Sequence, residues 1–339
     1  MVLEPVFKSE LWIYLLNLNE KKMKQLSILL LLFVSAFASA QVPAELKGQT
    51  ITVIVPYGPG GGADTFNRMF ANKVKQNTGL NIVVVNKAGA FATIGTREVA
   101  ESKPDGLTLL GTDNSPIVFN PLVHQQGAVP RESFKSILVT VITPQGVYVK
   151  ADSKYNTLNQ LLEDIKKDPN KFTYGCAYQM CNLFLERLMH QINSTVVSIP
   201  YKSTPQVLMD LVNGQLSFLG TSSSDALGLT QGGKVKPIGF GTDHPVDLYP
   251  TVPLFKNSVP NFTATNFHGL YAPVDTPQHI VVYLNKVYRE AMRDPEIQEQ
   301  LRSRAVMAFD GNSDDAEKYI TRQINNWKPI VEKFYKAPQ

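Results

Sequence analysis

Short apolar runs alternate with helical patterns along the first third of the chain. Residues 51–55 form an apolar run, and Phe, Met and Val side chains then recur at helical spacing over residues 65–77. The near-continuous apolar run at 81–85 is typical of a strand buried on both faces of a parallel sheet. A helix at 93–102 and a strand at 107–111 follow, so the pattern predicts an α/β fold with a mostly parallel sheet and right-handed crossovers.

A second series of strands and helices begins near residue 146. Thr157 and Gln160 have the spacing of a capping box for a helix that runs to residue 167. Another helix is expected to begin at Thr204 as its N-cap and to stop at Gly214. Strands are predicted at 146–149, 171–176, 195–201 and 216–221.

The repetition of the plan predicts two α/β lobes with a hinge and a ligand cleft between them. Residues 268–273 are a candidate return strand, and the long helices at 277–294 and 314–334 are expected to pack back on the first lobe. We therefore expect lobe 1 to comprise residues 41–143 and 267–339, and lobe 2 to comprise residues 144–266.

The loop between the first strand and the first helix indicates the type of ligand. Four of the five residues 58–62 are glycines. A strand that ends in glycines before a helix exposes backbone N–H groups at the positive end of the helix dipole, which favours an anion. Because three parallel strands end in the polar loops 57–63, 87–93 and 112–116, we expect these loops to face one cleft.

Two side chains beside the glycines each have two interpretations. Asp64 could contact a ligand, but an acid in the first helical turn more often caps the helix and balances its dipole. Tyr57 could be a core aromatic or a wall of the cleft, and its position just after the end of the strand favours the cleft.

The first forty residues have the features of an export signal. Lysines precede a 12-residue apolar run at 26–37, and the small residues at 38–40 match a cleavage pattern that would leave Gln41 as the mature start. Twelve residues are fewer than the roughly 20 that span a bilayer, although an uncleaved N-terminal anchor is the alternative. Met23 lies where a signal peptide ordinarily begins, so residues 1–22 can be an over-extended translation start.

The charge of the chain is too small to indicate a nucleic-acid partner. The chain has 33 Lys and Arg against 29 Asp and Glu, and removal of residues 1–40 leaves 29 against 26, a net charge of +3. The sequence also has no Lys/Arg-rich run of the kind that binds nucleic acid. Its 43% hydrophobic content is ordinary for a globular protein.

The usual signatures of catalysis are missing from the sequence. The glycine loop loosely fits a dinucleotide fingerprint, but the next strand ends in Asn86-Lys87 instead of the acid that would bind the ribose. There is no phosphate-binding Gly-Lys-Ser/Thr, no nucleophile elbow, and no pair of histidines at metal-ligand spacing. We therefore expect a binding site with no catalytic residue, no metal and no cofactor.

Cys176 and Cys181 are the only cysteines. Export would permit a disulfide between them, but a loop this short often fails to reach good disulfide geometry. The sequence leaves both the bridged and the free state open.

Several segments match, in order, the motifs of one known family. The opening PYGPGGGAD is similar to the motif P-[FY]-P-P-G-G-G-[TS]-D. Further matches are NKAGA at 86–90 with Ile94-Gly95, PDGLTLL at 104–110 with Asn120-Pro121, KFTY at 171–174, VSIPYK at 197–202 with Asp210-Leu211 and Gly214-Gln215, and GLYAP at 269–273. In these segments, which extend over essentially the whole mature chain, the sequence resembles the tripartite tricarboxylate transporter receptors, also called the Bug family of extracytoplasmic solute receptors.

The resemblance implies a periplasmic binding protein-like fold of type II that closes on a small carboxylate. Family members hold the acid mainly through backbone N–H groups and bridging water. Carried over by position, the candidate ligand-binding residues of lobe 1 are Tyr57, Gly58, Gly61, Gly62, Ala63, Asp64, Asn114 and Ser115. Those of lobe 2 are Tyr178, Gln179, Cys181, Tyr201, Ser223 and Asp225.

Three departures from the family pattern affect these assignments. Gly58 replaces a proline, which loosens the loop, and Ser203 replaces a glycine. The segment 177–181, AYQMC, replaces a small glycine- and serine-rich loop. Bulky residues there should alter the cavity, so the ligand class cannot be transferred from a relative.

The sequence as a whole favours a non-enzymatic periplasmic solute-binding protein. It would capture a di- or tricarboxylate or an aromatic acid and deliver it to the membrane permease of a tripartite tricarboxylate-type transporter. We expect a monomer with no nucleic-acid partner. The alternative is an exported enzyme, or a sensor component, that acts on a small carboxylic acid.

Overall fold

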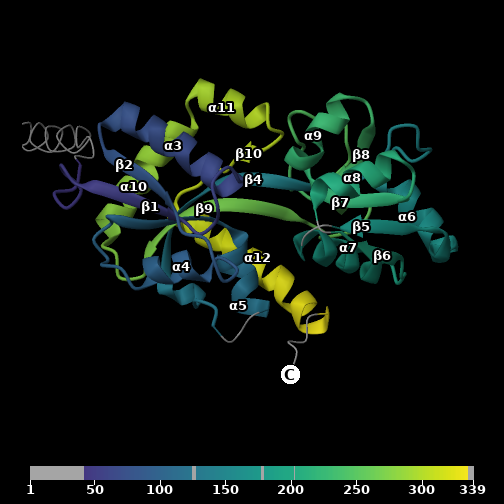
Figure 1. Cartoon of the computed structure of the whole chain (residues 1–339), viewed down its shortest axis with the longest axis horizontal. Helices are drawn as coiled ribbons and strands as arrows, with labels where there is room; N and C mark the ends of the chain where they lie inside the picture. Colours follow the sequence, from purple (N-terminus) through teal and green to yellow (C-terminus); the bar gives the residue numbers. More distant parts are fainter. Residues whose placement is uncertain (1–41, 124–126, 177–178, 202, 335–339) are drawn as a thin grey trace, which may run out of the picture. The chain divides into compact units, whose positions relative to one another are not determined.

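The computed structural model describes residues 42–123, 127–176, 179–201 and 203–334. The chain divides into two units, residues 1–43 and 44–339, and every element below belongs to the second (Figure 1). The expected signal peptide and its cleavage before Gln41 lie outside the described residues.

The first sheet is built from the strands predicted in the first third of the chain. β1 (Thr50–Val55) pairs in parallel with β2 (Asn81–Asn86) and with β3 (Thr108–Asp113). The crossover helices are α3 (Gly62–Thr78) and α4 (Thr93–Ala100). The parallel pairing confirms the predicted parallel core. Two further strands, β9 (Thr265–Pro273) and β4 (Phe134–Lys150), join it by antiparallel pairing in the order β2-β1-β3-β9-β4.

The prediction that 81–85 is buried on both faces is wrong. β2 is the outermost strand of its sheet, and the side chain of Val83 is 44% exposed. An apolar run in an edge strand has the same sequence pattern as one in a central strand, so the pattern could not separate the two cases.

The second sheet repeats the arrangement. β5 (Thr173–Cys176) pairs in parallel with β6 (Val197–Pro200) and with β7 (Phe218–Ser222). β7 and β8 (Val235–Phe240) pair antiparallel with the second part of a long strand, β4. The helices of this half are α6 (Leu158–Lys167), α7 (Gln179–Gln191), α8 (Thr204–Val212) and α9 (Ser223–Gln231).

Two strands connect the two sheets. β4 (Phe134–Lys150) pairs with β9 (Thr265–Pro273) as far as Pro144 and with β7 from Gln145 onward. The segment after β8 passes close to the start of β9, since a Cβ at Gly241 would lie 2.4 Å from the carbonyl oxygen of Ala264. Figure 1 shows these two long strands running from one half of the unit to the other.

The predicted N-cap is confirmed at α6 and is displaced by one residue at α8. Thr157 Oγ1 accepts from the Gln160 backbone N–H at 3.4 Å, and Gln160 Oε1 accepts from the Thr157 N–H at 3.3 Å, which confirms the capping box. The N-cap of α8 is Ser203, whose backbone is extended, so the expected N-cap Thr204 is wrong by one position.

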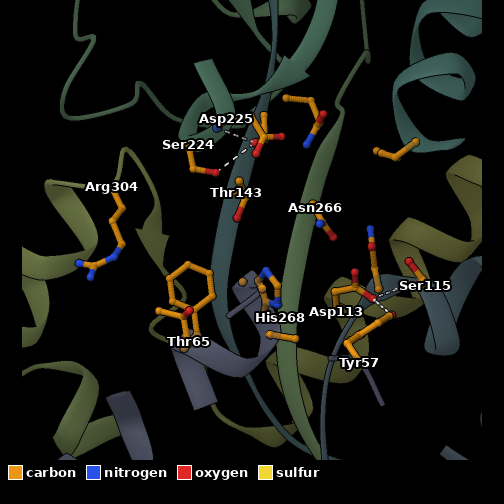
Figure 2. A pocket seen from close by; sticks show the side chains of 18 of the residues that line it. Tyr57, Thr65, Asp113, Ser115, Thr143, Ser224, Asp225, Asn266, His268 and Arg304 are labelled. Carbon is orange, nitrogen blue, oxygen red and sulfur yellow. Dashed lines mark hydrogen bonds between the residues drawn. The ribbon is translucent and has the colours of Figure 1, made fainter. Parts of the chain in front are cut away.

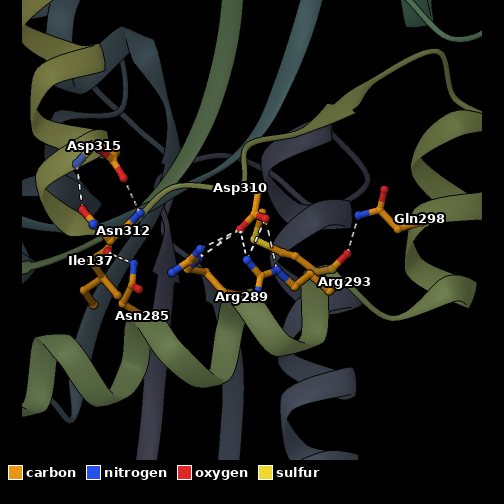
Figure 3. A network of polar contacts seen from close by, with 9 residues as sticks. Ile137, Asn285, Arg289, Arg293, Gln298, Asp310, Asn312 and Asp315 are labelled. Carbon is orange, nitrogen blue, oxygen red and sulfur yellow. Dashed lines mark hydrogen bonds and ion pairs between the residues drawn. The ribbon is translucent and has the colours of Figure 1, made fainter.

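The C-terminal helices pack on the first sheet. α10 (Gln278–Met292) contacts α3 and β4, and the buried Asn285 amide donates to the Ile137 carbonyl at 2.8 Å. Arg289 and Arg293 both pair with Asp310, which ties α10 to the segment that follows β10 (Met307–Ala308) (Figure 3).

The helix expected to run through residue 294 ends at Met292, because Asp294 caps a separate helix, α11 (Pro295–Arg302). β10 (Met307–Ala308) pairs with β4, and α12 (Ser313–Phe334) closes the described chain. The remaining short elements are a π-helix at Ser115–Phe119, the helix α5 (Asn120–Val123) and 3₁₀ turns at Arg131–Ser133, Pro169–Lys171 and Phe255–Asn257. Over the described residues, no helix combines the length and apolarity that a membrane span requires.

Candidate ligand-binding site

A cavity of about 640 Å³ lies where the ends of the two sheets meet. Its size is in the range of small-molecule sites, roughly 300–1,000 Å³. Figure 2 shows the side chains that surround it. It is lined by Tyr57, Gly60, Gly61, Gly62, Ala63, Thr65, Phe66, Asp113, Asn114, Ser115, Phe119, Thr143, Gln145, Met180, Ser222, Ser224, Asp225, Asn266, His268 and Arg304.

The N-terminus of α3 contributes backbone donors to this cavity. Gly61 is the N-cap, with φ −74° and ψ 171°, and no side chain caps the helix there. The first backbone hydrogen bond of the helix runs from the Thr65 N–H to the Gly61 carbonyl at 2.9 Å. The N–H groups of Gly62 and Ala63 therefore have no acceptor among the described residues, and both residues line the cavity.

Asp64 holds the glycine loop in place. Its carboxylate accepts from the Gly60 N–H at 2.9 Å, from Arg68 Nε at 2.9 Å and from the Asn86 amide at 3.0 Å. Burial alone would raise the pKa of Asp64, but these donors and the Arg68 charge outweigh burial and lower it. Asp64 is absent from the cavity lining, which gives no support to the predicted ligand contact. It lies in the first turn of α3, as the helix-dipole interpretation expects, but it holds the loop before the N-cap and does not cap the helix.

Tyr57 and Asp113 form a pair at the wall of the cavity. The Tyr57 hydroxyl donates to Asp113 Oδ1 at 2.6 Å, and the Ser115 N–H donates to the same oxygen at 2.9 Å (Figure 2). Burial, followed by the charge and the hydrogen bond of Asp113, raises the pKa of Tyr57 well above its usual value. The phenol therefore remains a donor, and Tyr57 lies in the cleft wall, as the sequence favoured.

His268 lies under the first turn of α3. A Cβ at Gly62 would be 3.3 Å from His268 Cε1 and 3.4 Å from Nε2, so a glycine lets the helix approach the imidazole ring. The ring packs edge-on against Phe66, with 4.9 Å between the centroids. His268 is 6% exposed, and its Nδ1 has no hydrogen-bond partner among the described residues. Burial lowers its pKa, against a smaller upward effect of Asp113.

The end of β7 and the first turn of α9 form the opposite wall. Ser222 Oγ accepts from the Asp225 N–H at 3.1 Å as the N-cap and lies 3.0 Å from Ser224 Oγ. Ser223 instead donates to the Ala305 carbonyl at 2.6 Å. Ser222, Ser224 and Asp225 therefore line the cavity, whereas the predicted Ser223 is turned away from it.

The remaining candidates from the sequence have different positions. Cys181 is buried, is joined to Cys176 by a disulfide and does not line the cavity. The neighbouring Met180 does line it. Tyr201 packs beside Gly175, and burial together with Asp210 raises its pKa to about 12. Tyr201 and Gly58 are both absent from the lining.

Two further candidates of lobe 2 remain predictions. Tyr178 lies outside the described residues. Gln179 is the first residue of α7, but its side chain is also outside the described part.

Several lining residues were not among the candidates predicted from the sequence. Thr143 and Gln145 on β4, and Asn266 and His268 on β9, are polar side chains at alternate positions of largely buried strands. This period of two was visible in the sequence, but the strands that carry it were only partly predicted. The loop 87–93, all of which is described, provides no lining residue of this cavity.

The chemistry of the cavity is that of a binding site for a polar molecule. Asp113 and Asp225 are its carboxylates, Arg304 is its guanidinium, and His268 has the lowered pKa. Within the described residues, no group of three or more His, Cys, Asp or Glu is arranged to hold a metal ion.

Comparison with known proteins gives relatives across most of the chain. Protein BugT of Bordetella pertussis is 25% identical over 316 residues, which cover 90% of this chain and 96% of BugT. MatC from Rhodopseudomonas palustris, solved with bound malate, is 21% identical with a TM-score of 0.66 and covers 84% of this chain and 99% of its own. An R. palustris protein solved with adipate is 20% identical with a TM-score of 0.70, covering 84% and 97%.

These similarities agree with the architecture described above. Like the solved periplasmic binding protein BugD, which is 25% identical with a TM-score of 0.65 and covers 84% of this chain and 97% of its own, the chain has a two-lobed α/β fold. The family model described as "Tripartite tricarboxylate transporter family receptor" matches residues 66–335. The chain belongs to the tripartite tricarboxylate transporter receptor family, also called the Bug family.

Proposed function

We propose that this protein is a periplasmic receptor that captures a small organic carboxylate between its two lobes. The observation that carries the proposal is the pair of Gly62 and Ala63 N–H groups at the positive end of α3, which line the cavity without an acceptor among the described residues. Such donors favour an anionic group, and a carboxylate is one. The unpartnered Nδ1 of the buried His268 beside them is a second sign that a polar group completes the site.

The ligands of the solved relatives support the same class. MatC was solved with malate and the second R. palustris protein with adipate, and both of these are small dicarboxylates. The helix dipole contributes only about 0.3–2 kcal/mol. Neutral hydrogen bonds and apolar walls such as Phe66 and Met180 must therefore supply the rest of the affinity.

In this proposal, Tyr57, Gly61, Gly62, Ala63, Asn114 and Ser115 contact the ligand from lobe 1, and Asp225 contacts it from lobe 2. We keep 143/144 and 266/267 as the lobe boundaries, and β4 and β9 act as the hinge. Closure would bury the carboxylate between the two sets of loops, so the ligand favours the closed state through contacts that only this state completes.

The proposal includes export and delivery. The chain would be cleaved before Gln41, reach the periplasm as a monomer, and pass its ligand to the membrane permease of a tripartite tricarboxylate-type transporter. Family membership supports this role.

The test is a binding screen that also detects turnover. The purified mature chain is titrated by thermal shift and calorimetry with mono-, di-, tri- and aromatic carboxylates, and each mixture is then analysed for products. We expect saturable stabilisation by at least one carboxylate and complete recovery of that ligand. Product formation by the purified protein would show an exported enzyme instead, and the absence of binding across the panel would refute the receptor.

A further inference from the structure

Asp113 has one oxygen engaged by the protein and one that the described residues leave open. Oδ1 accepts from the Tyr57 hydroxyl at 2.6 Å and from the Ser115 N–H at 2.9 Å. Among the described residues, no donor reaches Oδ2, although Asp113 lines the cavity. The two bonds to Oδ1 fix the orientation of the carboxylate, so Oδ2 is a preorganised acceptor.

This acceptor lies next to the carboxylate cradle, defined as the N–H groups of Gly62 and Ala63 at the start of α3. Asp113 on β3 is directly opposite His268 on β9 in the antiparallel register. The Cβ atoms of such directly opposed residues are roughly 5 Å apart. The His268 ring in turn lies against Gly62 at the start of α3. One side chain therefore separates the Asp113 carboxylate from the N–H groups of the cradle.

The charges around the cavity disfavour a ligand whose only polar groups are carboxylates. Two carboxylates, Asp113 and Asp225, line it against the single guanidinium of Arg304 among the described lining residues. A bare ligand carboxylate beside Asp113 would meet a like charge, which is costly in a partly dry site. A hydroxyl or ammonium group at the same place would instead donate to Oδ2.

We propose that the ligand carries a hydrogen-bond donor on the carbon next to the carboxylate held by α3, and that Asp113 Oδ2 accepts from this donor. The ligand is thus a 2-hydroxy or 2-amino carboxylic acid. This inference rests on the proposed function and narrows it. Asp113 is the residue that gives such acids a higher affinity than the parent acids, which lack the C2 substituent.

The first experiment compares acids that differ only at C2. The wild-type protein is titrated by calorimetry with succinate, malate and aspartate, and with glutarate, 2-hydroxyglutarate and glutamate. A hydrogen bond to a charged group corresponds to roughly a tenfold or larger gain in affinity. We expect at least one substituted acid to bind about tenfold or more tightly than its parent, and the malate and aspartate arms distinguish a hydroxyl from an ammonium donor.

The second experiment changes the acceptor. In Asp113→Asn the amide oxygen can still accept from Tyr57 and Ser115, while an NH₂ group replaces Oδ2 and opposes the ligand donor. We expect the preference for the substituted acid to fall below about threefold. Asp113→Ser, which removes the carboxylate, serves if the first variant does not fold. Asp152→Asn, an exposed acid that pairs with Lys150 on the surface, is the control for the loss of one charge.

The outcomes separate this inference from the proposed function. If carboxylates bind but the parents bind as tightly as the substituted acids, the inference fails and the receptor stands. A preference that persists in both Asp113 variants would also overturn the inference, because the donor would then be recognised elsewhere. If no carboxylate binds, both proposals fail together.

Discussion

Two carboxylates flank the glycine loop, and their hydrogen bonds give them different tasks. Asp64 uses both oxygens to hold Gly60, Arg68 and Asn86. Asp113 lines the cavity, and its bonds to other described residues all go to Oδ1. Both follow a predicted strand, and the sequence alone could not assign the tasks. The difference arises because Asp64 is contacted by two residues from different elements. Arg68 lies one helical turn after Asp64 on α3, and Asn86 lies at the end of β2.

Asp64→Asn should loosen the glycine loop. The amide cannot accept from all three donors at once, so we expect the free energy of unfolding to fall by about 1–3 kcal/mol at pH 7. Because the pKa of Asp64 is lowered, its contribution is present above the ordinary value of 3.8 and is lost as the pH falls through the folded value. Urea unfolding at pH 7 and pH 3 measures this, and an unchanged stability at pH 7 would contradict it.

The neutral His268 should make the fold sensitive to mild acid. Burial keeps its pKa below the ordinary 6.5, so the unfolded chain binds a proton that the folded chain does not. Stability should therefore fall as the pH drops below about 6.5. Urea unfolding between pH 8 and 5 should show a smaller loss for His268→Asn than for wild type. Equal pH dependence of the two proteins would show that His268 does not carry the effect.

At the scale of elements, the sequence predicted those with a local signal. The strands and helices of the first sheet follow from apolar periodicity, and the capping box of α6 follows from Thr157 and Gln160. β4 was predicted only at its end, since a 17-residue buried strand that changes partners at Pro144–Gln145 has no local turn signal. The floor of the cavity was missed for the same reason, because Thr143, Gln145 and His268 lie on these crossing strands.

The two N-caps of the second half offer a matched comparison of capping energies. Thr157→Ala removes the side-chain oxygen that caps α6 and should lower the free energy of unfolding by about 0.5–2 kcal/mol. Ser203→Ala should cost clearly less, because the Ser203 side chain makes no capping hydrogen bond to α8. Urea titration of both variants tests this, and equal losses would argue against the assignment.

At the scale of the molecule, the cavity lies at the crossing between two sheets. β4 and β9 carry Thr143, Gln145, Asn266 and His268 into it, so the connecting strands line the cavity together with segments of both halves. The sequence predicted the two-lobed plan because its strand–helix pattern occurs twice. It could not predict which residues of the connecting strands face the ligand, since that depends on the register between strands distant in the chain.

The disulfide joins this site to the second sheet. Cys176 ends β5 and Cys181 lies in the first turn of α7, next to the lining residue Met180. Protein isolated from the periplasm and denatured without reductant should contain no reactive thiol. Reduction should then lower the free energy of unfolding by about 2 kcal/mol, as expected for a short loop. Two reactive thiols before reduction would contradict the bridge.

Binding of the ligand carboxylate at the start of α3 can be tested by substitution of Gly61. A Cβ there meets nothing within 4 Å, and the backbone at φ −74° accepts any L-residue, so Gly61→Ala and Gly61→Asp should both fold. An aspartate at this N-cap accepts from the N–H groups of the first turn and replaces the ligand with its own charge.

The measurement is a calorimetric titration of wild type, Gly61→Ala and Gly61→Asp with the carboxylate that binds wild type most tightly. We expect the alanine variant to bind within a few-fold of wild type. The aspartate variant should lose about a hundredfold or more in affinity through like-charge repulsion, with an unliganded stability equal to or above that of wild type. Wild-type affinity in Gly61→Asp would contradict the account.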